Sequence, residues 1–536
     1  MKKTAKSLLL LAVALLFSML LAACASEPDE GGTGSDGANE GAEGGSEGGD
    51  LVIATAADIV SLDPAGSNDQ PSSNVQANIF ETLVTYDQNM ELQPGLAEEW
   101  EAVEDNVWEF KLREGVTFHD GSEFNAEVVK ANIERILDPE VASPRAFLYE
   151  MVTEVEVVDD YTVRFVTEYP FSPLPAHLAH NGGGMVSLEQ IEADYAAMEE
   201  GEEPGSVINE NPVGTGFFKF EEWQSGQHVR LVKNEDYWGE PAKLDSVTFK
   251  VVGEDLTRVA ELETGDSHVS DPLSPSDVAQ IEATEGVNVQ QQVSTSLSYV
   301  GFNADKEPFD DPKVRQAITM AIDKDQIIEG IYDGIGTPAV GPLAPNVFGY
   351  DENVTGIEYD PERAKELLAE AGYEDGFSTT IWTNDQRERI DMATNIQSQL
   401  KEIGIDAEIE VLEWGAYLEQ TANGEHDMFM LGWSTVTGDA DYGLYALFHS
   451  SMEGEPGNRT FLDDPEIDEL LDEARQESDE AKRQELYSEV QEKLVELAPM
   501  LYIHHQDYLL GVRDEVKGLV QDPTGIIRLH ETTLEN

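Results

Sequence analysis

Cysteine is almost absent from this chain, because Cys24 is the only one in 536 residues. A single thiol excludes an intramolecular disulfide and any metal cluster built from several cysteines. Basic residues are also scarce: 32 Lys and Arg stand against 108 Asp and Glu, and the formal net charge is −76. A field of this sign repels nucleic acid and anionic lipid, so we exclude both as partners.

The excess of acidic residues indicates the habitat of the organism rather than the identity of a ligand. Salt weakens the self-repulsion of such a surface, since the Debye length falls to about 3 Å at molar ionic strength. We therefore interpret the charge as the adaptation of a halophile to a saline habitat. Hydrophobic residues still make up 40% of the chain. The length exceeds what one hydrophobic core usually supports, so we expect at least two lobes.

Catalytic signatures are missing as well. The histidines show no HExxH spacing, and a nucleophile elbow, a Walker loop and a dinucleotide fingerprint are absent. The glycines of residues 212–216 lack the lysine of a phosphate loop and indicate a structural turn. We expect a protein that is not an enzyme and holds no cofactor or metal, although an Asp/Glu pair stays open as a catalytic alternative.

The N-terminal residues have the pattern of a processing signal. Lys2, Lys3 and Lys6 precede an apolar stretch at 8–20, which is shorter than the roughly 20 residues of a membrane span. The stretch ends in Leu-Ala-Ala-Cys at 21–24, which resembles the lipobox of bacterial lipoproteins. The resemblance implies a signal peptide at 1–23 and lipidation of Cys24. The alternative is an ordinary signal that happens to end in cysteine.

Residues 24–50 are rich in Gly, Ser, Glu and Asp and contain no aromatic side chain. A segment of this composition cannot bury enough apolar area to offset its ordering entropy, so we expect a flexible tether. The lipid would then hold the protein at the outer face of the cytoplasmic membrane. No segment after residue 50 is apolar enough to span a bilayer.

Local patterns predict alternating helices and strands. In the first half we expect strands at 51–56, 108–112, 229–232 and 246–252, a hairpin at 152–166, and helices at 75–83 and 125–137, the latter capped by Asn125. In the second half we expect helices at 312–322, 361–371, 392–403 and 467–497, and strands at 405–412, 428–433 and 500–504. This alternation is typical of an α/β protein.

Six segments together resemble one family, the extracellular solute-binding proteins of ABC importers for peptides, nickel chelates and glutathione. They occur in the order of that family, and they are 92–121 (LQPGLAEEWEAVEDNVWEFKLREGVTFHDG), 211–220 (NPVGTGFFKF), 234–239 (NEDYWG), 302–303 together with 308–322 (PFDDPKVRQAITMAI), 359–372 (YDPERAKELLAEAG) and 432–448.

The resemblance implies a two-lobed periplasmic-binding-protein fold of type II, with an extra subdomain and a hinge of two crossing strands near 298–303 and 501–505. Lobe I would comprise 51–88, 211–297 and 503–536, with the extra subdomain at 89–210, and lobe II would comprise 298–502. Closure of two lobes on a ligand is common in extracellular binding proteins. The partners implied are a small peptide-like ligand and the permease subunits of an importer. We expect a monomer.

The segment 432–448 (GWSTVTGDADYGLYALF) bears on the ligand. Dipeptide binders of the family carry an Asp for the ligand ammonium where this chain has Val436. The segment is more similar to the glutathione-binding branch, and so is the ten-residue spacing from Trp382 to Met392. We therefore favour glutathione or a related γ-glutamyl peptide.

A γ-glutamyl tripeptide carries one ammonium and two carboxylates, so its site needs an acid and at least one arginine. Asp439 and Asp441 are candidates for the ammonium, although most acids in so acidic a chain face solvent. The candidates for the carboxylates are Arg387, Arg389 and Arg459. Trp382, Trp414 and Trp433 are candidates for the pocket wall, with buried core as the alternative role.

Other functions of the same fold stay open at this point. They are binding of dipeptides or oligopeptides, binding of a nickel chelate, and a sensory receptor. Nickel usually takes histidine ligands, and His449 directly follows the 432–448 segment.

Overall fold

The computed structural model describes residues 48–454 and 457–535. The predicted signal peptide, Cys24 and nearly all of the predicted tether lie outside the described residues. No helix of the described part is both long and apolar enough to cross a membrane.

A seven-stranded sheet has the order β12-β19-β11-β1-β10-β9-β8. β1 pairs in parallel with β10 and β11, whereas the outer pairs are antiparallel. Leu51 and Ile53 of β1 are fully buried in an apolar cluster that includes Val247 and Leu510. The strands are β1 (Asp50–Thr55), β8 (Phe218–Gln224), β9 (His228–Lys233), β10 (Ser246–Val251), β11 (Val269–Asp271), β12 (Val287–Val293) and β19 (Asp507–Arg513).

A six-stranded sheet has the order β14-β18-β13-β17-β15-β16 and is mixed, because β15 runs parallel to both of its neighbours. Alternate residues of β17 face different apolar clusters: Met428 and Met430 belong to one, and Phe429 and Leu431 belong to another. The strands are β13 (Ser296–Phe302), β14 (Thr337–Pro338), β15 (Phe377–Asn384), β16 (Ile405–Leu412), β17 (Met428–Ser434) and β18 (Met500–His505).

The chain crosses between the two sheets at two neighbouring points. It leaves β12 and enters β13 through Ser294 and Thr295, and it returns from β18 to β19 through Gln506. The Ser294 hydroxyl donates to the Gln506 carbonyl, and a His505 ring nitrogen lies 2.9 Å from the Ser296 carbonyl oxygen. The two crossings are therefore hydrogen-bonded to each other. The limits proposed for the lobes stay a prediction.

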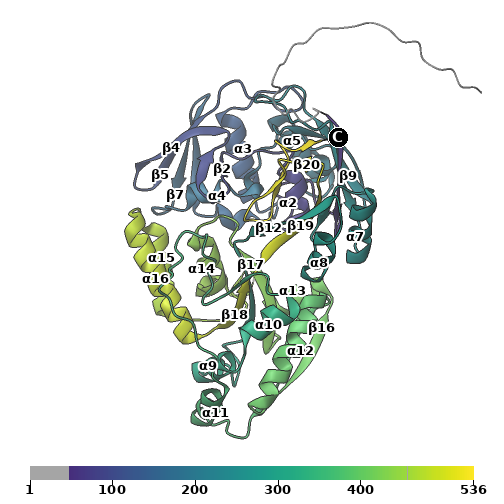
Figure 1. Cartoon of the computed structure of the whole chain (residues 1–536). Coiled ribbons are helices and arrows are strands. Elements are labelled where there is room, and N and C mark those ends of the chain that lie inside the picture. Colours follow the sequence, from purple (N-terminus) through teal and green to yellow (C-terminus); the bar gives the residue numbers. More distant parts are fainter. Residues whose placement is uncertain (1–47, 455–456, 536) are drawn as a thin grey trace, which may run out of the picture. The chain divides into compact units, whose positions relative to one another are not determined.

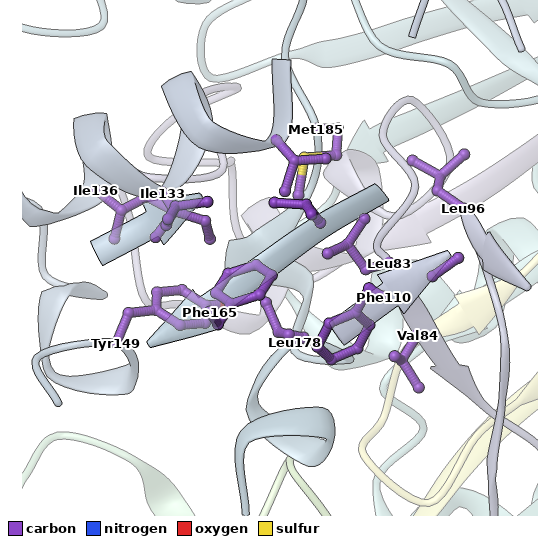
Figure 2. Packing of buried hydrophobic residues seen from close by; sticks show 14 of the residues in the cluster. Leu83, Val84, Leu96, Phe110, Ile133, Ile136, Tyr149, Phe165, Leu178 and Met185 are labelled. Atoms are coloured by element: carbon purple, nitrogen blue, oxygen red, sulfur yellow. The ribbon is translucent and has the colours of Figure 1, made fainter. Parts of the chain in front are cut away.

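Residues 97–167 form a smaller four-stranded antiparallel sheet in the order β4-β5-β7-β6. Its strands are β4 (Ala97–Glu104), β5 (Val107–Leu112), β6 (Val152–Asp159) and β7 (Thr162–Thr167). Figure 2 shows its core, in which Phe110 and Phe165 meet with ring centroids 5.3 Å apart, and Ile133 and Ile136 contribute from a helix. That helix, α3 (Ala126–Leu137), begins after Asn125, whose side chain accepts from two backbone N–H groups.

Three helix predictions, at 75–83, 392–403 and 467–497, are wrong in their limits. The helix expected at 75–83 is α2 (Gln70–Gln76), and the Ile79 carbonyl beyond its end accepts a bond from the Gly216 N–H instead. The single helix expected at 467–497 is two helices, α15 (Pro465–Gln476) and α16 (Glu480–Leu497), which pack against each other (Figure 1). The Asp479 side chain caps α16 by accepting from the Lys482 N–H, and this cap starts a new helix.

The structure contains the remaining predicted strands, and the helices at 312–322 and 361–371, within one or two residues of the predicted limits. The helix predicted at 392–403 begins earlier, at Arg387. The other helices are α4 (Leu174–His177), α5 (Leu188–Glu200), α6 (Ser206–Glu210), α7 (Asp255–Thr264), α8 (Val278–Glu282), α9 (Pro312–Met320), α10 (Lys324–Ile331), α11 (Pro361–Glu370), α12 (Arg387–Glu402), α13 (Trp414–Ala422) and α14 (Ala440–Phe448). Three two-stranded sheets complete the fold: β2 (Val84–Tyr86) with β3 (Leu92–Pro94), β20 (Val516–Lys517) with β23 (Thr533–Leu534), and β21 (Val520–Gln521) with β22 (Ile527–Arg528).

Candidate functional site

Two cavities of about 520 Å³ each meet at the C-terminal end of β17, where both are lined by Gly432, Trp433 and Ser434. We call them cavity A and cavity B. Cavity A lies between residues that precede and begin α2, residues near 145 and 180, and residues of the six-stranded sheet and its helices. Cavity B lies beside the two chain crossings and the start of α12. Their size is typical of small-molecule sites.

Arg145 supplies the most deeply buried charge of cavity A, since the residue is only 1% exposed. Its Nε donates to the Ser67 carbonyl oxygen at 2.7 Å, and its Nη1 lies 2.9 Å from His180 Nε2. No carboxylate of the described residues lies within 4 Å of the guanidinium. Burial lowers the pKa of Arg145 to about 10, so the group stays cationic at neutral pH. The hydrogen-bond partners of this buried cation are neutral, and the charge of the Asp69 carboxylate acts on it only from beyond 4 Å, so the guanidinium is suited to binding a ligand anion.

Asp69 provides an acceptor on the wall of the same cavity. It caps α2, and its Oδ1 accepts from the Ser72 N–H at 2.9 Å. Its Oδ2 is buried and has no hydrogen-bond partner among the described residues. A buried carboxylate oxygen without a donor is costly. Asp69 is therefore suited to accept from a ligand ammonium.

Arg389 of α12 lines cavity B and carries a second cation, which is half-buried. Its Nη1 donates to Asn384 Oδ1 at 3.1 Å, and its guanidinium carbon lies 5.8 Å from the centre of the Trp414 ring. Within the described ranges, no carboxylate lies within 4 Å of the guanidinium. Burial lowers the pKa of Arg389. Arg389 was among the residues that we considered for a ligand carboxylate, and its surroundings suit that role.

Asp439 is engaged in a structural contact outside both cavities. The residue is 7% exposed, and its carboxylate makes a bidentate pair with Arg483 at 2.7 and 3.0 Å. Its Oδ1 also caps α14 by accepting from the Asp441 N–H. Because Arg483 already supplies a cationic partner for both of its oxygens, the Asp439 carboxylate is not available to a ligand ammonium.

Asp441 is engaged in a similar way. It is 2% exposed, and Arg475 binds its two oxygens at 3.0 and 3.1 Å, while His177 Nε2 lies 3.5 Å away. Burial raises the pKa of Asp441, but Arg475 and His177 outweigh burial and hold the pKa well below its usual range. Arg475 also donates to the Tyr169 hydroxyl at 3.2 Å, so the pair joins α14 and α15 to residues 169–177.

The other predicted residues divide between the cavities and the core. Trp433 lines both cavities, and its buried Nε1 has no acceptor in the described part of the chain. Trp414, which is 43% exposed, and Arg459 line cavity A, and Arg459 donates to Thr421 and to the Gly454 carbonyl. Trp382 lines neither cavity and belongs to an apolar cluster.

Arg387 lines cavity B, but its side chain is 75% exposed and lies 3.9 Å from Asp391. Val436, at the position where dipeptide binders carry an Asp, lines cavity A.

His449 does not line either cavity. Its Nε2 lies 3.5 Å from Asp472, and its Nδ1 accepts from the Ser451 N–H. In residues 48–454 and 457–535, no group of three or more His, Cys, Asp or Glu side chains is placed to hold a metal ion.

Sequence reasoning missed Arg145 and Asp69. Both come from the first part of the chain, whereas we sought ligand contacts near the 432–448 segment. Arginines are rare in this chain, and Arg145 follows Ser143 and Pro144 in a stretch without a helical pattern. The rarity of arginine was the one sequence feature that could have drawn attention to Arg145, and it did not show that the Arg145 side chain is buried.

Comparison with known proteins identifies the family. The profile of bacterial extracellular solute-binding proteins, family 5 Middle, matches residues 91–455. The glutathione-binding protein GsiB of Pectobacterium atrosepticum is 35% identical over 495 residues, which cover 90% of this chain and 94% of that protein. The dipeptide-binding protein of Escherichia coli is 34% identical over 470 residues, 83% of this chain and 86% of that protein.

Solved structures agree in fold. The periplasmic binding protein DppA of Helicobacter pylori, in complex with the peptide STSA, superposes with a TM-score of 0.81 at 33% identity and covers 91% of this chain and 98% of its own. A dipeptide-binding protein of Pseudoalteromonas with bound Met-Leu gives a TM-score of 0.82 at 27% identity, over 91% of this chain and all of that one.

These matches confirm the resemblance and the fold class predicted from the six segments, and the family consists of binding proteins rather than enzymes. The chain belongs to family 5 of the bacterial extracellular solute-binding proteins.

Proposed function

We propose that this chain is the substrate-binding protein of an ABC importer and that it captures glutathione or a related γ-glutamyl peptide in cavities A and B. One observation carries the choice of ligand. The two cavities hold two guanidinium groups with no carboxylate of the described residues within 4 Å, those of Arg145 and Arg389, and one buried carboxylate oxygen without a donor among the described residues, that of Asp69. Glutathione carries the complementary set of two carboxylates and one ammonium.

Dipeptide capture is the second candidate, because the dipeptide-binding protein of E. coli is almost as similar as the glutathione-binding relative. An α-dipeptide has one terminal carboxylate, and it would leave one of the two guanidinium groups without an anionic partner. An uncompensated buried charge opposes closure around such a ligand. Val436 also leaves the dipeptide binders' usual ammonium position without an acid.

A binding titration tests the proposal. Calorimetry on the protein without its lipid anchor should give the highest affinity for glutathione, and weaker binding for its monoethyl ester at glycine and for N-acetyl glutathione. The first analogue loses a carboxylate and the second loses the ammonium. Glutathione should also raise the melting temperature by mass action. Tight binding of Met-Leu or a longer α-peptide, without binding of glutathione, would assign the chain to peptide capture.

Nickel chelates and sensing are the remaining alternatives. The protein NikZ of Campylobacter jejuni, whose structure contains Ni(L-His), shares the fold with a TM-score of 0.80 at 25% identity over 90% of this chain and 99% of its own. Including Ni(L-His) in the same titration separates that function from peptide capture. Uptake of labelled glutathione by cells with and without the protein separates import from sensing.

We also propose that a lipid on Cys24 holds the protein at the outer face of the cytoplasmic membrane. The support is the Leu-Ala-Ala-Cys motif behind a short apolar stretch. A thioether-linked diacylglycerol contributes two acyl chains, which suffices for stable anchoring. Cys24→Ala should leave the precursor at full length in a pulse–chase experiment and prevent incorporation of labelled palmitate. Normal cleavage of that variant at another small residue would contradict the lipoprotein proposal.

A further inference from the structure

A third cavity, cavity C, of about 320 Å³ adjoins cavity A. The two cavities share Tyr86, Ala179, Asn181 and Arg528 as lining residues. The walls of cavity C are largely aromatic, and the rings belong to Phe80, Tyr86, Phe217, Tyr237 and Trp238. None of its lining residues comes from the six-stranded sheet or its helices. Cavity C is therefore formed without any contribution from the part of the chain that carries Trp433.

The wall of cavity C contains one carboxylate, that of Glu81. Its Oε1 accepts from the Tyr237 hydroxyl at 2.7 Å, and its Oε2 accepts from Trp238 Nε1 at 2.8 Å and from the Thr215 hydroxyl at 2.7 Å. All three donors are neutral. No basic side chain of the described residues lies within 4 Å of this carboxylate. Burial raises the pKa of Glu81 and outweighs these three hydrogen bonds, which lower it. The carboxyl group has no cationic partner at contact distance, and a bound cation would favour its ionised form.

The arginines near cavity C have their own anionic partners. Arg528 pairs with Asp522 at 3.0 Å, and Arg113 pairs with Glu98 at 3.3 Å while its guanidinium carbon lies 5.2 Å from the Trp238 ring centre. The His530 ring, which also lines the cavity, has Glu531 at 3.0 Å. The space beside Glu81 thus combines a carboxyl group, which a cation would hold in its ionised form, with aromatic faces that attract a cation.

We propose that cavity C is a subsite for a basic side chain, an ammonium or guanidinium, of a peptide whose backbone charges are bound in cavity A. This inference rests on the proposed function, because it needs a peptide in cavity A. It extends the ligand class from glutathione to γ-glutamyl peptides that carry a lysine or an arginine. The basic group would lie against Glu81 and the rings of Tyr237 and Trp238.

The test compares two synthetic tripeptides, γ-Glu-Cys-Lys and γ-Glu-Cys-norleucine, by calorimetry on the wild-type protein. Their side chains have the same four-carbon stem, and only the lysine ends in an ammonium. A cation against aromatic rings in a desolvated site is stabilised, so the lysine peptide should bind at least about tenfold more tightly, which corresponds to about 1.4 kcal/mol. Equal affinities of the two tripeptides would overturn the subsite and leave the proposed function intact. If neither tripeptide nor glutathione binds, both proposals fail.

Two variants place the effect at cavity C. Glu81→Gln keeps the shape of the side chain and removes its charge. This variant should bind the lysine and norleucine tripeptides with about equal affinity. Thr85 of β2 lines cavity C but neither cavity A nor cavity B, so Thr85→Lys should bring an internal ammonium toward Glu81 and abolish the preference in the same way. The neutral control Thr85→Asn should keep it. A preference that persists in both Glu81→Gln and Thr85→Lys would show that the lysine binds elsewhere.

Discussion

Replacing Arg145 by methionine should weaken glutathione binding by a factor of roughly 30 or more. The guanidinium is buried beside cavity A and has no carboxylate of the described residues within 4 Å, so a ligand carboxylate would be its anionic partner. Removal of one partner of a desolvated charge pair commonly costs about 2–5 kcal/mol. At about 1.4 kcal/mol per tenfold, the lower limit corresponds to roughly 30-fold. Titration calorimetry below the melting temperature measures the change directly.

Two further variants separate binding from folding. Arg363→Met removes an exposed arginine of α11 that pairs with Glu366, and it should leave the affinity unchanged. Arg145→Lys keeps the charge but loses the two-pronged geometry that matches a carboxylate, so we expect an intermediate loss. An Arg145→Met protein that melts earlier but binds glutathione with wild-type affinity would show that the guanidinium only supports Ser67 and its neighbours.

Local signals were enough to predict much of the fold. Asn125 predicts the start of α3 because its side chain caps the helix. The pair Asp159-Asp160 predicts the turn of the hairpin that β6 and β7 form. Predictions that needed distant residues were less accurate. Beyond the end of α2, the Gly216 N–H donates to the Ile79 carbonyl oxygen. The sequence around residue 79 does not reveal this contact, because Gly216 is distant in the chain.

The same distinction applies to the site. Trp433 was predicted from the segment that carries the family resemblance, and Arg459 was predicted as a basic group in an acidic chain; both line cavity A. Arg145 and Asp69 were missed because the fold brings them to Trp433 from about 300 residues away in the chain. Asp439 and Asp441 were predicted because they lie within the 432–448 segment. Their arginines, Arg483 and Arg475, follow on later helices, and their pairing is visible only after the chain has folded.

Asp441→Asn should lower the free energy of unfolding by about 3–5 kcal/mol, because it leaves the buried Arg475 without its anionic partner. The effect should be visible as a large drop in melting temperature at pH 7. The exposed Asp391, 3.9 Å from Arg387, provides the matched control. Asp391→Asn should change stability by less than about 0.5 kcal/mol, as is usual for surface pairs.

The dependence on pH makes this prediction specific to the carboxylate of Asp441. Its pKa in the folded protein lies well below the value of about 3.9 expected in the unfolded chain. A depressed folded pKa contributes stability that is fully present above the unfolded pKa and is lost as the pH falls toward the folded pKa. The stability gap between wild type and Asp441→Asn should therefore be constant from pH 7 to about 5 and shrink below about 4. An Asp441→Asn protein with wild-type stability and no affinity for glutathione would instead make Asp441 a ligand contact.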